Sequence, residues 1–79
     1  MQVSEEDVKF LEDNRYHYNL LVNAGMVRHL DGATRSKMQE IIANYFNKGY
    51  SADLWCAQCC MEMLKLCYTL YDTWKAKQN

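Results

Sequence analysis

The chain has 79 residues, a formal net charge of −1 and no proline. A chain of this length forms one domain, residues 1–79, and buries only about 60–65% of the surface its unfolded state exposes, so its stability margin is small. The near-neutral charge lacks the basic excess typical of DNA-binding domains. We find no signal-peptide pattern and no run of about 18 apolar residues, so we expect no secretion signal and no membrane span.

The first predicted element is a helix over residues 5–24. Ser4 is a good N-cap, and the acidic residues after it occupy the first turn, where the helix dipole favours negative charge. Gly25 is a residue type that commonly ends a helix. Apolar side chains recur along one face of this segment at helical spacing. They are Val8, Phe10, Leu11, Tyr18, Leu21 and Val22.

The second predicted element is a helix over residues 34–48, capped by Asp31 or Thr34. Gly49 stands where the left-handed residue after a helix belongs. The apolar face of this helix is clearly defined. It consists of Met38, Ile41, Ile42, Tyr45 and Phe46.

The third predicted element is the longest, a helix over residues 52–77 with Ser51 as its N-cap. Its polar side chains fall on one narrow stripe, which leaves apolar residues over roughly 220° of the circumference. That stripe consists of Gln58, Glu62, Lys65, Thr69, Asp72 and Ala76. We therefore predict an all-α fold, an antiparallel three-helix arrangement with a long central C-terminal helix. No segment alternates with the period of a strand.

All four cysteines lie in this third predicted helix, within a span of twelve residues. Cysteines on one helix bridge each other poorly, so we expect reduced thiols and a cytoplasmic location, the host cytoplasm if the protein is viral. Cys60 and Cys67 are best explained as core residues, and Cys59, nearer the edge of the apolar face, is the thiol we expect to react. No bound cofactor is expected.

An alternative is a zinc-stabilised or redox-sensitive regulator that uses Cys56, Cys59 and Cys60. A tetrahedral zinc site needs a fourth ligand, and Cys67 lies two turns too far along the helix. The segment WCAQC resembles the redox motif of thioredoxin-like proteins, which would imply thiol chemistry. That motif belongs after a strand, and none is predicted here.

Asn14 interrupts the apolar face of the first predicted helix. A buried amide must be hydrogen-bonded, so Asn14 either contacts a neighbouring helix or sets the register of an oligomer. The alternative is that Asn14, Arg15, His17 and Tyr18 line a polar pocket for a small ligand. Under either interpretation we expect Asn14 to be buried with a specific partner.

Two further functional classes receive little support. Arg28, Arg35 and Lys37 lie around the turn before the second helix, as in a helix-turn-helix DNA binder, but Glu40 interrupts the basic surface. Nucleic acid is therefore not an expected partner. There is no serine–histidine–acid set and no glycine-rich phosphate loop, so we predict that the protein is not an enzyme.

The third helix is also the predicted site of self-association. At about 25 residues it spans ~37 Å, whereas the second helix spans only ~21 Å. Its C-terminal half would then expose apolar side chains that a two-fold partner could cover. The predicted interface consists of Leu66, Leu70, Tyr71 and Trp74. Tyr71 and Trp74 would be its anchors.

The C-terminal segment CAQCCMEMLKLCYTLYD joins a C-x-x-C pair to an aromatic, leucine-rich helix. It resembles the ends of small uncharacterised helical proteins of Bacteroidetes phages and mobile elements, over about a third of the chain. The resemblance implies a phage-encoded accessory or structural protein. With the composition, it predicts a small non-catalytic interaction or ligand-binding protein that acts as a homo-oligomer.

Overall fold

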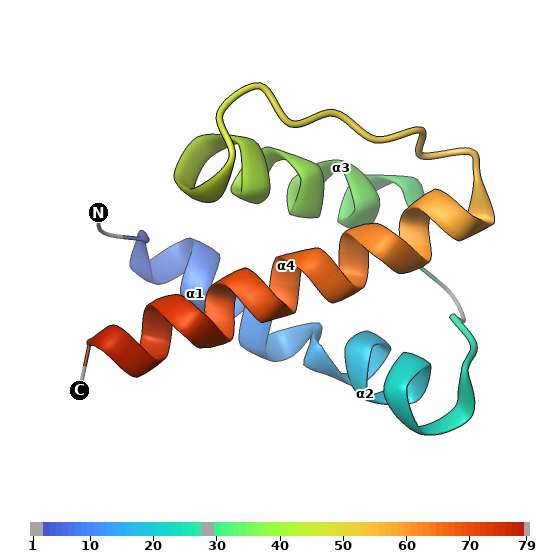
Figure 1. The fold of residues 1–79 in the computed structure, drawn as a ribbon, viewed down its shortest axis with the longest axis horizontal. Coiled ribbons are helices and arrows are strands. Elements are labelled where there is room, and N and C mark those ends of the chain that lie inside the picture. Colours follow the sequence, from blue (N-terminus) through green and yellow to red (C-terminus); the bar gives the residue numbers. More distant parts are fainter. Residues whose placement is uncertain (1–2, 28–29, 79) are drawn as a thin grey trace.

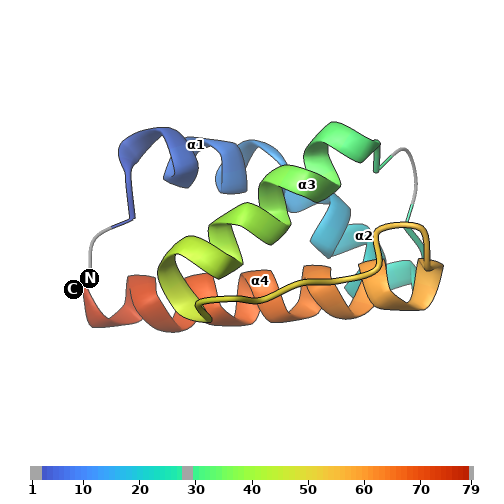
Figure 2. The same cartoon turned by 90° about the horizontal axis from the view of Figure 1, so that it is seen from above.

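The computed structural model describes residues 3–27 and 30–78. In these residues the chain forms four α-helices and one π-helical turn, with no strand, which confirms the predicted all-α class. The elements are α1 (Glu5–Asp13), α2 (Arg15–Ala24), α3 (Gly32–Ile41), η1 (Ile42–Phe46) and α4 (Ala57–Lys77) (Figure 1). Figure 2 shows α4 along one side of the molecule, with α1 and α3 across from it. The long helix packs against both α2 and α3.

The polar stripe predicted on the long helix is confirmed, because all six of its residues are exposed. The opposite face supplies half of the main hydrophobic core. Its buried residues recur at the three- and four-residue spacing of one helix face. They are Cys60, Met63, Leu64, Cys67, Tyr68 and Tyr71.

The first predicted helix is divided in two at Asn14, so the prediction of one helix over residues 5–24 is wrong. Asn14 has φ −105° and ψ 8°, outside the helical range. Its backbone N–H and its side-chain amide both donate to the carbonyl of Phe10, at 3.1 and 2.9 Å. Asparagine favours such local bonds over a continuous helix. Gly25 ends α2 in the left-handed conformation, with φ 67°, as predicted.

The second predicted helix has the expected start but a different end. The side chain of Asp31 accepts from the N–H of Thr34 at 2.7 Å, so Asp31 is the N-cap. The α-helix changes at Ile42 into a π-helical turn, which closes with a bond from the N–H of Asn47 to the carbonyl of Ile42. Gly49 is left-handed, with φ 88°, but it lies beyond Asn47, which is the actual C-cap.

The third predicted helix begins five residues later than expected, at Ala57. Residues 51–56 are not helical, and Cys56 rather than Ser51 is the N-cap. The thiol of Cys56 accepts from the N–H of Cys59 at 3.2 Å. The segment is held beside α3, because the N–H of Ala52 donates to the side chain of Gln39 at 2.8 Å (Figure 1). This hydrogen bond to a residue of α3 holds residues 51–56 in a non-helical conformation where a first turn of the long helix was predicted.

Candidate interaction surface around Trp55

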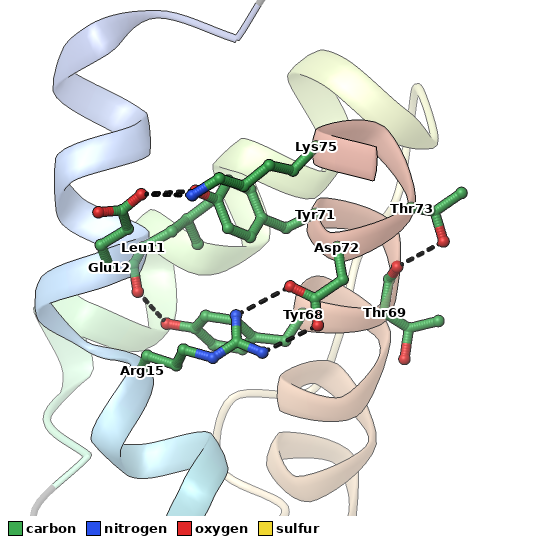
Figure 3. Close-up of polar contacts among 9 residues, drawn as sticks. All are labelled: Leu11, Glu12, Arg15, Tyr68, Thr69, Tyr71, Asp72, Thr73 and Lys75. Carbon is green, nitrogen blue, oxygen red and sulfur yellow. Dashed lines mark hydrogen bonds and ion pairs between the residues drawn. The ribbon is translucent and has the colours of Figure 1, made fainter. Parts of the chain in front are cut away.

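Among the residues predicted to line a ligand pocket, Arg15 connects two helices. Arg15 forms a bidentate ion pair with Asp72 at 2.9 Å, which links α2 to α4 (Figure 3). Its guanidinium lies over the rings of Tyr18 and Tyr68, at 5.6 and 5.4 Å from their centroids. The hydrogen bonds from Arg15 also lower the pKa of Asp72. Such a planar, stacked arrangement suits arginine, and here it serves packing.

The other predicted ligand residues also lie within the fold. Asn14 is half-buried and bonded to its own helical segment, so the tertiary contact expected for it is replaced by a local one. His17 is buried, with its ring 4.1 Å from that of Tyr16. Neither of the two cavities described below is lined by Asn14, Arg15, His17 or Tyr18. A ligand at these residues stays a prediction.

Tyr71 is not available as an interface anchor, contrary to our prediction. It is 1% exposed, and its hydroxyl donates to Glu12 of α1 at 3.0 Å, where Lys75 also forms an ion pair (Figure 3). The prediction expected the C-terminal half of the long helix to extend beyond the short second helix and so to be left exposed. In the structure, α1 lies beside the C-terminal half of α4 and covers Tyr71.

The remaining predicted interface residues form one flank of α4. Leu66, Leu70 and Trp74 are half-buried. Leu70 and Trp74 line a cavity of about 270 Å³ together with Phe46, Lys77 and Gln78. We call Leu66, Leu70, Trp74 and Phe46 the α4 flank. Its use in self-association stays a prediction.

The cysteines do not assemble the zinc site considered as an alternative. Within residues 3–27 and 30–78, no three His, Cys, Asp or Glu side chains lie close enough to hold a metal ion. The thiol of Cys60 is buried and donates to the carbonyl of Leu54 at 3.4 Å, whereas the thiol of Cys56 caps α4. Cys67 is also buried, and burial raises its pKa to about 12. Cys60 and Cys67 are thus core residues, as predicted.

Cys59 has an environment that slows its reaction as a nucleophile. Its hydrogen bond with the Cys56 thiol, followed by partial burial, raises the pKa of Cys59 to about 11. A thiol with that pKa is almost entirely protonated at neutral pH, and the thiolate is the reactive form. This counts against Cys59 as the first thiol to react.

The basic residues predicted for nucleic-acid binding have partners within the chain. Arg35 donates to the carbonyl of Leu54 at 2.8 Å, and Lys37 pairs with Asp7 at 2.9 Å. Arg28 lies outside the described residues. The start of α3 therefore does not present Arg35 and Lys37 as a free basic surface.

Trp55 is the most exposed large apolar side chain described in the chain, at 93%. The backbone around it is nonetheless anchored. The side chain of Asp53 accepts from the N–H of Trp55 at 3.0 Å, and the Leu54 carbonyl accepts from both Arg35 and Cys60. The segment therefore holds the indole in solvent.

A cavity of about 370 Å³ opens beside this indole, at the start of α3. Its volume falls within the range of ligand pockets, and leucine, arginine and tryptophan side chains contribute to its wall. It is lined by Leu30, Asp31, Gly32, Arg35, Ser36, Leu54 and Trp55. We call Trp55 and these lining residues the Trp55 surface.

Sequence reasoning missed the Trp55 surface because it placed Trp55 inside a helix from residue 52. One signal was present. Asp53 is a residue type that bonds the backbone two residues further on and so favours a turn over a helix. The partners that fix the turn, Gln39 and Arg35, come from another helix and carry no local pattern.

No helix in the described part of the chain is both long and apolar enough to cross a membrane. Comparison with known proteins gave no match: no family model, no curated protein and no solved structure is significantly similar to this chain.

Proposed function

We propose that the protein is a small non-catalytic interaction protein that acts as a homo-oligomer, and that its copies meet through the Trp55 surface. The observation that carries this proposal is the exposure of Trp55, at 93%, on an anchored segment. Tryptophan is among the residues that contribute most to binding energy at protein interfaces. Because the backbone that carries the indole is already held in place, binding needs to order only the side chain, which favours affinity.

The second support is that the indole and the cavity lie on the same surface. In a two-fold dimer both copies use the same patch. Every contact from the first copy to the second is therefore repeated from the second copy to the first. A two-fold axis beside Trp55 would place the indole of each copy at the cavity of the other. Leu30 and Leu54, which line the cavity, would then supply apolar contact to the indole.

Sedimentation equilibrium tests the proposal with wild type, Trp55→Ala and the matched control Gln58→Ala. Gln58 is also exposed and lies in the first turn of α4. Wild type should sediment above the 9.4 kDa of one chain at tens of micromolar. Trp55→Ala removes the indole from both copies, so at about 2 kcal/mol for each hot spot it should weaken association roughly 1,000-fold. Gln58→Ala should leave it unchanged.

Two results would contradict the proposal. A wild type that stays at 9.4 kDa at these concentrations would remove the homo-oligomer. If wild type is oligomeric and Trp55→Ala self-associates with the same affinity, the Trp55 surface is not the contact between copies. Circular dichroism should show unchanged helix content in Trp55→Ala, because the exposed indole contributes little to the core.

The α4 flank is a second candidate contact surface. It is favoured by the cavity of about 270 Å³ between Phe46, Leu70 and Trp74. A phage-encoded accessory or structural role, in a host cytoplasm, is compatible with self-association through either surface. The four free cysteines fit such a reducing compartment.

A further inference from the structure

We propose that Cys56 and Cys59 form a redox-active dithiol that closes reversibly to a disulfide. The inference is independent of the proposed self-association. It rests on the late start of α4, which takes Cys56 out of the helix. Cys56 has extended backbone angles, φ −94° and ψ 119°, and its sulfur lies 3.2 Å from the backbone nitrogen of Cys59.

This geometry removes the objection that two cysteines on one helix cannot bridge. The objection applies when both residues have helical backbone angles, since their side chains then diverge. Here Cys56 is the N-cap and Cys59 lies in the first turn, so the cap side chain folds back over the residue it would join. The Cys56 sulfur therefore already lies against the backbone of the residue it would join.

The other two thiols are excluded by burial. Cys60 is 4% exposed and its thiol donates to the Leu54 carbonyl, and Cys67 is fully buried further along α4. Cys56 and Cys59 are both half-buried, so a small disulfide can reach them. The exchange is therefore confined to this pair.

The oxidant we name is a small disulfide such as oxidised glutathione. The Cys56 thiol gives its proton to solvent, and its sulfur, which already accepts a backbone N–H at the positive end of a helix, attacks one glutathione sulfur and expels a glutathione thiolate. The Cys59 thiol then gives its proton to solvent, and its sulfur attacks the Cys56 sulfur and expels the second glutathione thiolate. Two protein thiols are oxidised and one disulfide is reduced to two thiols. Reduced glutathione reverses both steps.

The test is intact mass and peptide mapping of the folded chain after equilibration in buffers of reduced and oxidised glutathione. Residues 56, 59 and 60 share one tryptic peptide, so the mapping uses a Cys60→Ala, Cys67→Ala variant that keeps only the proposed pair. We expect this variant and wild type to lose two hydrogens and to keep no glutathione. Cys56→Ser and Cys59→Ser should each keep one glutathione at the remaining thiol of the pair.

Several results would overturn the proposal. A wild type that keeps glutathione without closing, or that forms disulfides between chains, would show that the pair does not bridge. No mass change in folded wild type, with disulfide formation in urea, would show that the fold prevents closure. If the Cys60→Ala, Cys67→Ala variant fails to fold, wild type decides, with Cys60→Ala alone for mapping.

Discussion

Tyr68 of α4 forms a hydrogen bond with the end of α1, next to the break at Asn14. Its buried hydroxyl donates to the carbonyl of Leu11 at 2.6 Å, in the last turn of α1 (Figure 3). Carbonyls in the last turn of a helix lack partners within that helix, so another group must satisfy them. Tyr68 supplies the donor, and its ring stacks on that of Tyr18 at 5.1 Å. Burial raises the pKa of Tyr68, so the hydroxyl keeps its proton.

Tyr68→Phe should lower the free energy of unfolding by about 1–3 kcal/mol, because it leaves a buried carbonyl without a donor. Tyr71→Phe is the matched control. The Tyr71 hydroxyl bonds to Glu12, whose side chain is exposed and can turn to water, so its loss should cost less than about 1 kcal/mol. Urea denaturation measures both. Equal losses would mean that Leu11 is not the reason for the effect of Tyr68.

At the level of elements, Asp7 fixes α1 to the second helical segment. It is buried, and it accepts a hydrogen bond from Tyr45 of η1 at 2.6 Å and pairs with Lys37 of α3 at 2.9 Å. Burial alone would raise the pKa of Asp7. The hydrogen bonds with Tyr45, Lys37 and Ser4 outweigh burial and hold it below the ordinary value of 3.8.

Asp7→Asn should therefore lower stability by about 1–2 kcal/mol at neutral pH, a value discounted for the partly exposed Lys37. A carboxyl group whose pKa is lowered by folding stabilises above its unfolded pKa and loses that effect as pH falls through the folded value. The gap between wild type and Asp7→Asn should thus be constant above about pH 5 and shrink below pH 4. Thermal unfolding across pH measures it, with exposed Glu6→Gln as control. A gap that does not change with pH would contradict this account.

Element boundaries show what local pattern can and cannot predict. The caps Ser4 and Asp31 and the left-handed Gly25 were predictable because their partners lie within a few residues. The start of α4 was not, because Ser51 and Asp53 look like a cap and first turn while Gln39 and Arg35 hold the segment elsewhere. The site around Trp55 follows from that boundary.

For the whole molecule, the main prediction concerns which surface carries self-association. Leu70→Glu with Trp74→Glu introduces charge on the α4 flank, and Thr69→Glu, on the exposed polar stripe, is its control. If the Trp55 surface is the contact, both proteins should keep the wild-type mass in light scattering. A monomeric double variant beside an oligomeric control would assign the contact to the α4 flank. Tyr71 is unsuitable for this test, since a charge at a buried position would unfold the chain.

The periodicity of the long helix correctly predicted which stripe faces water, but it could not show which residues cover the wide apolar arc. Tyr68 and Tyr71 satisfy that arc inside the molecule, because their hydroxyls reach Leu11 and Glu12 of α1. Periodicity gives the direction of a side chain, whereas its partner depends on how α1 and α2 bend at Asn14.

The π-helical turn from Ile42 to Phe46 bears on how the chain could change in length. A π turn accommodates one residue more than the α-helical turn it replaces, closing here between Ile42 and Asn47. Removing Ala43 would restore α-helical pitch while Tyr45 and Phe46 keep roughly their present directions. Removing Lys65 from the middle of α4 would instead turn every later side chain by about 100° and bring the polar stripe against the core. In natural variants that are one residue shorter within this part of the chain, we therefore expect the missing residue to come from the π-helical turn.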